Sequence, residues 1–160
     1  MKKLTALTLL SLSLAACGSP SKPSTGPQPS GSATTGTGAA DARSAVVAFL
    51  NAGKNQDLQA LSGIWGSTEG AVLNTSMGGR EQRDEMEKRE LIMMCYLEHD
   101  SHQILSDAPA TNNERVVAAQ LRRGPLTRTA NFYAVAGPAG RWYVRTFDME
   151  VLTPFCRKGR

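Results

Sequence analysis

Residues 98–102 combine two imidazoles with two carboxylates. The sequence there is Glu98-His99-Asp100-Ser101-His102, and zinc sites are built from such side chains. The two histidines are three residues apart at an expected helix-to-strand junction. They would face opposite ways on a strand and converge on a helix. The chain has two histidines in all and no His-Glu-x-x-His motif. We therefore expect no metal and no cofactor here, and a capping or turn role for Asp100 and Ser101.

Asp148 and Glu150 are two residues apart in an expected strand, on one face with Trp142 and Val144. Two carboxylates at this spacing could act as general acid and base. Such a pair lies more often on the solvated face of a strand. We therefore assign no catalytic residue. This pair of carboxylates gives no reason to expect an enzyme.

Arg145 is the exception on the opposite face of the same strand. That face carries Tyr143, Phe147, Met149 and Val151, which are expected in the core. A guanidinium among them could bind an anion. The alternative, which we favour, is that Arg145 lies over the sheet edge or pairs with an acidic neighbour.

Cys17 follows a cationic start, an apolar segment and small residues, in that order. Lysines occupy positions 2 and 3, and the apolar segment ends in Leu14-Ala15-Ala16-Cys17. The segment from residue 4 to residue 14 has eleven residues, whereas a bilayer-spanning helix needs about 20. It is therefore interpreted as a signal peptide rather than a membrane helix. The pattern resembles the signal peptide and lipobox of bacterial lipoproteins.

The resemblance implies that residues 1–16 are removed and that the Cys17 thiol carries a diacylglycerol. One acyl chain anchors a protein only marginally, whereas two or three hold it essentially permanently. Gly18 follows Cys17, where an Asp in diderm bacteria commonly signals retention in the inner membrane. The resemblance thus favours the outer membrane, facing the periplasm or the cell surface. The alternative is an ordinary secretory signal that leaves a free N-terminal cysteine.

Residues 17–40 are expected to form the lipidated cysteine and a flexible tether. Of the 23 residues from 18 to 40, 18 are Ser, Gly, Thr or Pro, and none is aromatic or branched aliphatic. Such a segment buries too little apolar surface to offset its ordering entropy. As a coil it would span about 25 Å. Residues 41–160 then form one domain of a usual size.

The charge of the chain excludes nucleic acid as an expected partner. The formal net charge is +4 and the pI is about 9.2. Three of the lysines lie before residue 41, so residues 41–160 hold 15 basic and 14 acidic residues, a net charge of only +1. The two signs are interspersed, as on a solvated surface.

Cys95 and Cys156 are the two cysteines that remain once Cys17 is lipidated. In an oxidising compartment a pair about 60 residues apart is a plausible disulfide. It would join a C-terminal tail to a helix. The alternative is two free buried thiols.

Helices are expected first in the domain. Asp41 is a suitable N-cap for a helix to about Asn55, with Ala45, Val46, Phe49 and Leu50 on one apolar stripe. Asp57 is suited to cap a short second helix that Gly66 ends. Residues 66–79 are rich in Gly, Ser and Thr and predict a loop. A third helix is expected over residues 80–97, charged in its first half and apolar in its second, with Glu85 and Arg89 as an i,i+4 pair.

Strands are expected after residue 99. The pattern predicts strands over residues 102–105, 115–123, 127–136 and 141–152, with turns at Gly124-Pro125 and at residues 137–140. The last three are joined by short turns and predict an antiparallel meander. Helices followed by an antiparallel sheet give an α+β domain.

Three segments together resemble the nuclear transport factor 2-like superfamily. They are the helix of residues 42–55 leading to Ile64-Trp65-Gly66, the charged helix ending in Cys95-Tyr96-Leu97, and the strands ending at Phe147–Leu152. This superfamily includes SnoaL-like and ketosteroid-isomerase-like proteins. The resemblance implies a sheet that curls around the helices as a cone with a pocket. The competing fold is another α+β arrangement of helices and meander.

The implied pocket has four candidate lining residues, Trp65, Tyr96, Phe132 and Arg145. The resemblance also implies a possible homodimer through the open face of the sheet. Many unrelated functions use this shape.

Two functions remain. The first, which we favour, is a non-enzymatic, lipid-anchored module that binds a small molecule or a partner protein in the cell envelope. The second is a small pocket enzyme of the SnoaL or ketosteroid-isomerase kind acting on an exported substrate. It requires a carboxylate or a histidine with a shifted pKa inside the cone.

Overall fold

Helix α1 (Ala42–Asn55) begins at its predicted N-cap, Asp41. In the computed structural model, which describes residues 36–75, 80–111 and 113–157, the Asp41 carboxylate accepts from the Ser44 backbone N–H at 2.8 Å and from its hydroxyl at 2.7 Å. These bonds supply a partner for a free N–H of the first turn and lower the pKa of Asp41. The helix ends at Gln56, whose φ is 55°. The predicted helix is confirmed.

Helix α2 (Leu58–Ile64) is capped by Asp57, whose Oδ1 accepts from the Ala60 N–H at 2.9 Å. The helix ends at Ile64, two residues before the predicted Gly66. Gly66 itself is needed for a steric reason. A Cβ at Gly66 would collide with the Gly70 carbonyl oxygen, so glycine allows the two backbones to pair at this point. The short second helix is confirmed.

The loop predicted for residues 66–79 is wrong for its first ten residues. Strands β1 (Gly66–Ser67) and β2 (Gly70–Ala71) pair as a small hairpin, and α3 (Val72–Thr75) follows directly. Turn-rich composition marks the hairpin turn correctly but does not reveal the two short strands on either side of it. Residues 76–79 lie outside the described part of the chain.

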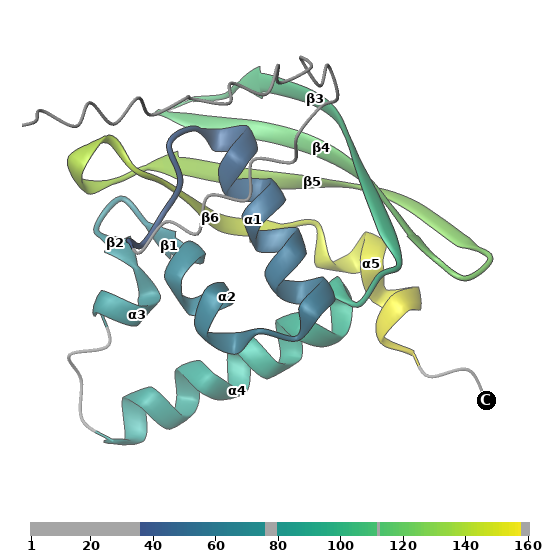
Figure 1. Cartoon of the computed structure of the whole chain (residues 1–160), viewed down its shortest axis with the longest axis horizontal. Helices are drawn as coiled ribbons and strands as arrows, with labels where there is room; N and C mark the ends of the chain where they lie inside the picture. Colours follow the sequence, from purple (N-terminus) through teal and green to yellow (C-terminus); the bar gives the residue numbers. More distant parts are fainter. Residues whose placement is uncertain (1–35, 76–79, 112, 158–160) are drawn as a thin grey trace, which may run out of the picture. The chain divides into compact units, whose positions relative to one another are not determined.

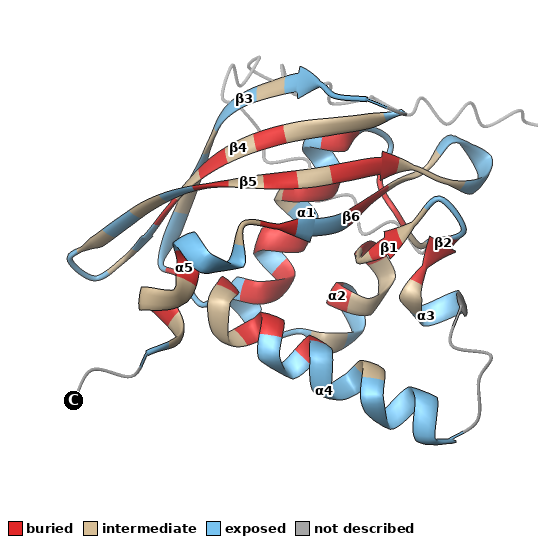
Figure 2. Cartoon of the chain, turned by 180° about the vertical axis from the view of Figure 1, so that it is seen from behind, coloured by how far each residue is buried: buried red, intermediate tan, exposed pale blue. Residues whose placement is uncertain are grey.

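Helix α4 (Arg80–Leu97) has the predicted bounds. The residues that it buries are Glu90, Met93, Met94 and Leu97, and most of its charged first half is exposed (Figure 2). The predicted Glu85–Arg89 pair forms at 3.5 Å, but both side chains are more than half exposed, so it contributes little to stability.

The sheet is a four-stranded antiparallel meander, in the order β3-β4-β5-β6. Its strands are β3 (Ser101–Pro109), β4 (Glu114–Arg123), β5 (Leu126–Ala136) and β6 (Trp142–Phe147), with a short 3₁₀ turn at Pro138–Gly140 before the last. The meander and its turns are confirmed. Strand β3 is longer than predicted, and its pairing with β4 continues past an irregularity between Ile104 and Ser106.

The strand predicted over residues 141–152 is wrong in its second half. Strand β6 ends at Phe147, and α5 (Met149–Cys156) follows. At the break, the Asp148 N–H donates to the Asn131 carbonyl at 3.0 Å. Leu152 and Phe155, three residues apart, are both fully buried, which a helix achieves and a strand does not.

Two expected core residues are displaced by this change from strand to helix. Met149 and Val151 are 39% and 36% exposed. Apolar residues alternate with other residues from Tyr143 to Val151, which predicts one long strand. The chain leaves the sheet at Asp148, so this alternation does not predict which side chains are buried after that residue.

The core lies between α1 and one face of the sheet, with α4 on the opposite side of α1 (Figures 1 and 2). The predicted stripe of α1 is fully buried. Phe49 from α1 contacts Phe132 of β5 and Phe147 of β6, with ring centroids 6.3 and 5.8 Å apart, and the two sheet rings stack at 5.5 Å. The fold is α+β, with N-terminal helices packed on an antiparallel sheet, as predicted. The cone-like curvature stays a prediction.

Contacts with the domain begin before residue 41. Ala39 and Trp142 exchange backbone hydrogen bonds of 2.9 Å, and the Gly38 N–H donates to the Gly63 carbonyl at 2.8 Å. The last residues of the expected tether therefore pair with β6. The expected signal peptide of residues 1–16, Cys17 and the tether up to residue 35 lie outside the described residues. No described helix is long and apolar enough to cross a membrane.

Helix α5 is attached to α4 by a disulfide. Cys95 and Cys156 are bonded, with their Cα atoms 4.8 Å apart, as predicted. Arg123 of β4 adds a second attachment, because it donates to the Phe155 carbonyl and forms an ion pair with Glu98 at 2.7 Å. The C-terminal helix is thus bound to both α4 and the sheet.

Replacing Cys95 and Cys156 together with serine is expected to lower the free energy of unfolding by about 2–4 kcal/mol, because the bond restricts the unfolded chain. Urea denaturation of the purified chain measures this change. The wild type treated with reductant serves as the matched control and should unfold like the double variant. Equal stability of the oxidised wild type and the variant would contradict the expectation.

Candidate functional site

The four residues expected to line a pocket do not come together around one cavity. Phe132 is fully buried in the aromatic core, and Tyr96 packs on the core from α4. Trp65 is partly buried, and its Nε1–H donates to the Arg145 backbone carbonyl at 3.3 Å. The Arg145 side chain lies at the surface. Enclosure of Phe132 leaves it no surface to offer a ligand.

Arg145 pairs with an acidic neighbour, which is the alternative that we favoured. Its Nη2 and Nε lie 2.6 and 3.2 Å from Oε1 of Glu114. Glu114 begins β4 and is largely buried, whereas Arg145 is about half exposed. The Arg145 guanidinium is therefore already paired with the Glu114 carboxylate.

Asp148 and Glu150 do not share a strand face. Asp148 Oδ2 accepts from the Asn131 N–H at 3.1 Å, and Oδ1 accepts from the Tyr133 hydroxyl at 3.3 Å. The nearby Asp148 charge raises the pKa of Tyr133. Glu150 lies exposed in the first turn of α5. Asp148 thus fastens β5 to the start of α5, and the two carboxylates are not arranged as an acid and base pair.

His99 and His102, in contrast, do meet. His99 lies in the connector between α4 and β3 and is only 5% exposed. Its Nε2 is 2.9 Å from His102 Nδ1, and the two rings meet edge to face with centroids 5.1 Å apart. The sequence left their relative orientation open because it depends on how the connector turns. The connector brings the rings together without a helix.

The hydrogen bonds of the pair determine where its protons lie. His99 Nδ1 is 2.6 Å from the Leu97 carbonyl oxygen at the end of α4, and a carbonyl can only accept. Nδ1 of His99 therefore carries the proton, and in the neutral ring Nε2 accepts from His102 Nδ1–H. His102 Nε2 is then the unprotonated nitrogen, and no described group bonds to it.

The surroundings of the pair oppose positive charge. Burial, followed by the charge of Lys54 at the end of α1, lowers the pKa of His99 against the opposing effects of the Leu97 hydrogen bond and Asp100. Burial also lowers the pKa of His102, and His99 and Lys54 lower it further. Both rings are therefore neutral near pH 7, and His102 Nε2 is available to take up a proton.

The flanking acids are engaged elsewhere. Asp100 Oδ2 accepts from the Gly124 N–H at 2.7 Å, across the turn between β4 and β5, and Glu98 pairs with Arg123. Asp100 therefore bonds to a distant turn rather than to its own junction, and Ser101 begins β3. Among the described residues, no three His, Cys, Asp or Glu side chains converge as metal ligands.

Glu90 is a buried acid that the sequence reasoning missed. It is 6% exposed, and its Oε1 lies 2.5 Å from Ser62 Oγ, which donates to the Leu58 carbonyl at 2.8 Å. The serine has one hydroxyl proton to offer to the Leu58 carbonyl or to the Glu90 carboxylate. Burial raises the pKa of Glu90, whereas donation from Ser62 lowers the pKa of that carboxyl group. Its position three, four and seven residues before Met93, Met94 and Leu97 was the available signal.

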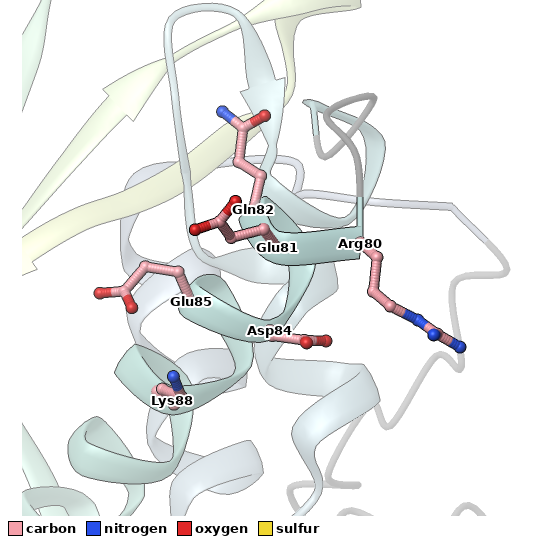
Figure 3. A pocket seen from close by; sticks show the side chains of 6 residues that line it. All are labelled: Arg80, Glu81, Gln82, Asp84, Glu85 and Lys88. Atoms are coloured by element: carbon pink, nitrogen blue, oxygen red, sulfur yellow. The ribbon is translucent and has the colours of Figure 1, made fainter.

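A hollow also lies along the first half of α4. It is lined by Arg80, Glu81, Gln82, Asp84, Glu85 and Lys88 (Figure 3). The side chains come from one exposed helix, and Arg80 points away from Glu85 in Figure 3. They present no common point to a ligand.

Comparisons with protein-family models, with curated proteins and with solved structures give no match to this chain.

Replacing Glu90 with glutamine is expected to stabilise the protein near neutral pH. The folded-state pKa lies above the ordinary value of 4.5, so the folded state binds more protons than the unfolded state between these two values. Stability therefore falls as the pH rises through the folded pKa. The amide donates to Ser62 without ionising and removes this fall, by about 1.4 kcal/mol for each unit of pKa elevation.

Urea unfolding between about pH 4 and about pH 8 measures the difference. Glu81→Gln, an exposed glutamate of the same helix, is the control and should follow the wild type. A pH dependence of Glu90→Gln that is indistinguishable from the wild type would show that Glu90 is not the group responsible.

Proposed function

We propose that the chain is a lipid-anchored protein of the bacterial cell envelope whose domain is a non-enzymatic module for binding a small molecule or a partner protein. One observation carries the anchor: Lys2 and Lys3, the apolar segment and Leu14-Ala15-Ala16-Cys17 occur in the order of a lipoprotein signal peptide and lipobox. Gly18 favours the outer membrane. The tether gives the domain its reach from the lipid surface.

The disulfide supports an exported protein. Cys95 and Cys156 form a bond within the described domain, and such bonds persist in oxidising compartments and are rare in the cytosol. It also supports the assignment of the third cysteine, Cys17, to a different purpose. An exported chain with an even framework leaves that thiol for the lipid.

A catalytic use of four acidic side chains is opposed by the bonds that they make. Glu114, Asp148, Asp100 and Glu98 each bond to a strand, a turn or an arginine within the domain. These bonds hold the ends of the strands and of α5. Side chains committed to positioning the backbone are poor acids and bases for a substrate.

The enzymatic alternative keeps one candidate, His102. A general base needs a free nitrogen within reach of the substrate proton. Both nitrogens of His99 are occupied, and His102 Nε2 is the nitrogen that remains. No arrangement of described residues favours the enzyme over the module.

Replacing Cys17 with alanine is expected to abolish membrane attachment. The alanine has no thiol to acylate, so incorporation of a labelled fatty acid and sedimentation with membranes should both be lost. Fractionation and labelling of cells that express each form measure this. Cys95→Ser is the matched control and should remain labelled. Labelling that persists in Cys17→Ala would contradict the anchor.

The module itself is tested by what it retains. Native mass spectrometry of the purified chain should show a bound small molecule, or cross-linking of the lipidated chain in its own envelope should capture one dominant protein. Cys17→Ala is the control for the cross-linking, because it removes the protein from the membrane surface. An empty domain with no captured protein would contradict a binding role.

A further inference from the structure

We propose that His99 and His102 form a proton-operated latch between the end of α4 and the start of β3. The latch is closed when both rings are neutral and when one of the two rings is protonated. It opens when both rings are charged, and the edge strand β3 is then loosened at its start. This inference rests on the geometry of the pair and does not depend on the lipid anchor.

The hydrogen bonds form one directed chain. The Leu97 carbonyl accepts from His99 Nδ1–H, and His99 Nε2 accepts from His102 Nδ1–H. The first residue is the end of α4, and the last is the second residue of β3. The chain therefore connects two elements whose only covalent link is the connector of residues 98–100.

The first added proton is compatible with the closed latch. It enters at His102 Nε2, the unprotonated nitrogen of the more exposed ring, and His102 Nδ1–H continues to donate to His99 Nε2. No existing hydrogen bond is lost. The pair then holds one positive charge.

The second added proton is not compatible. It can only enter at His99 Nε2, where its N–H would point at His102 Nδ1–H across 2.9 Å. Two donors cannot share a hydrogen bond, and the two charged rings repel. The His102 ring must move away. Because the two sites interact, they titrate as a pair in two separated steps.

The location gives the opening its consequence. β3 is at the edge of the sheet and pairs only with β4. His102 is paired with Leu121, a fully buried residue, so it lies on the face that packs toward α1. Removing this ring withdraws the contact of the edge strand with His99 and, through His99, with the end of α4.

The charged groups around the pair determine how stability changes with pH. Lys54 from α1 opposes charging of both rings, whereas Asp100 from the connector favours charging of His99. Glu98 is compensated by Arg123 at 2.7 Å, and β4 places the uncharged Leu121 opposite His102. The pKa values of both rings are lowered in the folded state, so stability is lost as the pH falls below about 6.5.

Nuclear magnetic resonance of the full chain, purified without a histidine tag, tests the latch. The chain has two histidines, so every imidazole signal belongs to the pair. At neutral pH both rings should carry their proton on Nδ1. On acidification the pair should titrate in two steps, and exchange of the amides of residues 101–103, corrected for the intrinsic rate, should rise at least about tenfold at the second step.

His102→Gln should leave a single titration step, that of His99, because the glutamine carries no charge and can present either its NH2 group or its oxygen to His99 Nε2. Amide exchange at residues 101–103 should then stay constant. Lys54→Gln is a second variant at an exposed position, and it should move both steps to higher pH. Lys88→Gln, an exposed lysine in the first half of α4, is its control and should move neither.

Three results would overturn the latch. They are a His102 ring with its proton on Nε2 at neutral pH, two rings that titrate independently, and exchange at residues 101–103 that does not change when the second proton binds. Unchanged titration in Lys54→Gln would do the same for the electrostatic part.

Discussion

The burial of Phe49 between α1 and the sheet is the contact on which the rest of the domain depends. Its ring touches Phe132 and Phe147 from two neighbouring strands, so a single side chain fixes the distance and the angle of α1 to the sheet. Close packing leaves little room for another arrangement. Gly53 then lets α4 approach α1, because any Cβ there would collide with Leu97.

The C-terminal helix closes this core from one end. Leu152 and Phe155 are buried in it, while the disulfide to α4 and the bonds of Arg123 hold the helix in place. An isolated helix of eight residues would be marginal in water. The disulfide adds stability that a helix of this length lacks on its own.

His99 and Glu90 are both ionisable side chains that the fold buries. Each is enclosed by the fold, and each takes part in a chain of hydrogen bonds. Burial lowers the pKa of His99 and raises that of Glu90. Acid therefore weakens the first site and favours the second, so the domain carries opposing pH responses at the two ends of the apolar half of α4.

The sequence by itself determined the elements that local rules govern: the capped helices and the meander. Caps and periodicity act over a few residues. The count of cysteines suggested a disulfide but left two free thiols as an alternative, and the structure shows the bond. Only the tertiary structure decided that the chain turns into α5 after Phe147, that His99 faces His102, and that Phe132 is enclosed rather than open to a pocket. These outcomes depend on which surfaces meet, because burial against distant segments outweighs local pattern.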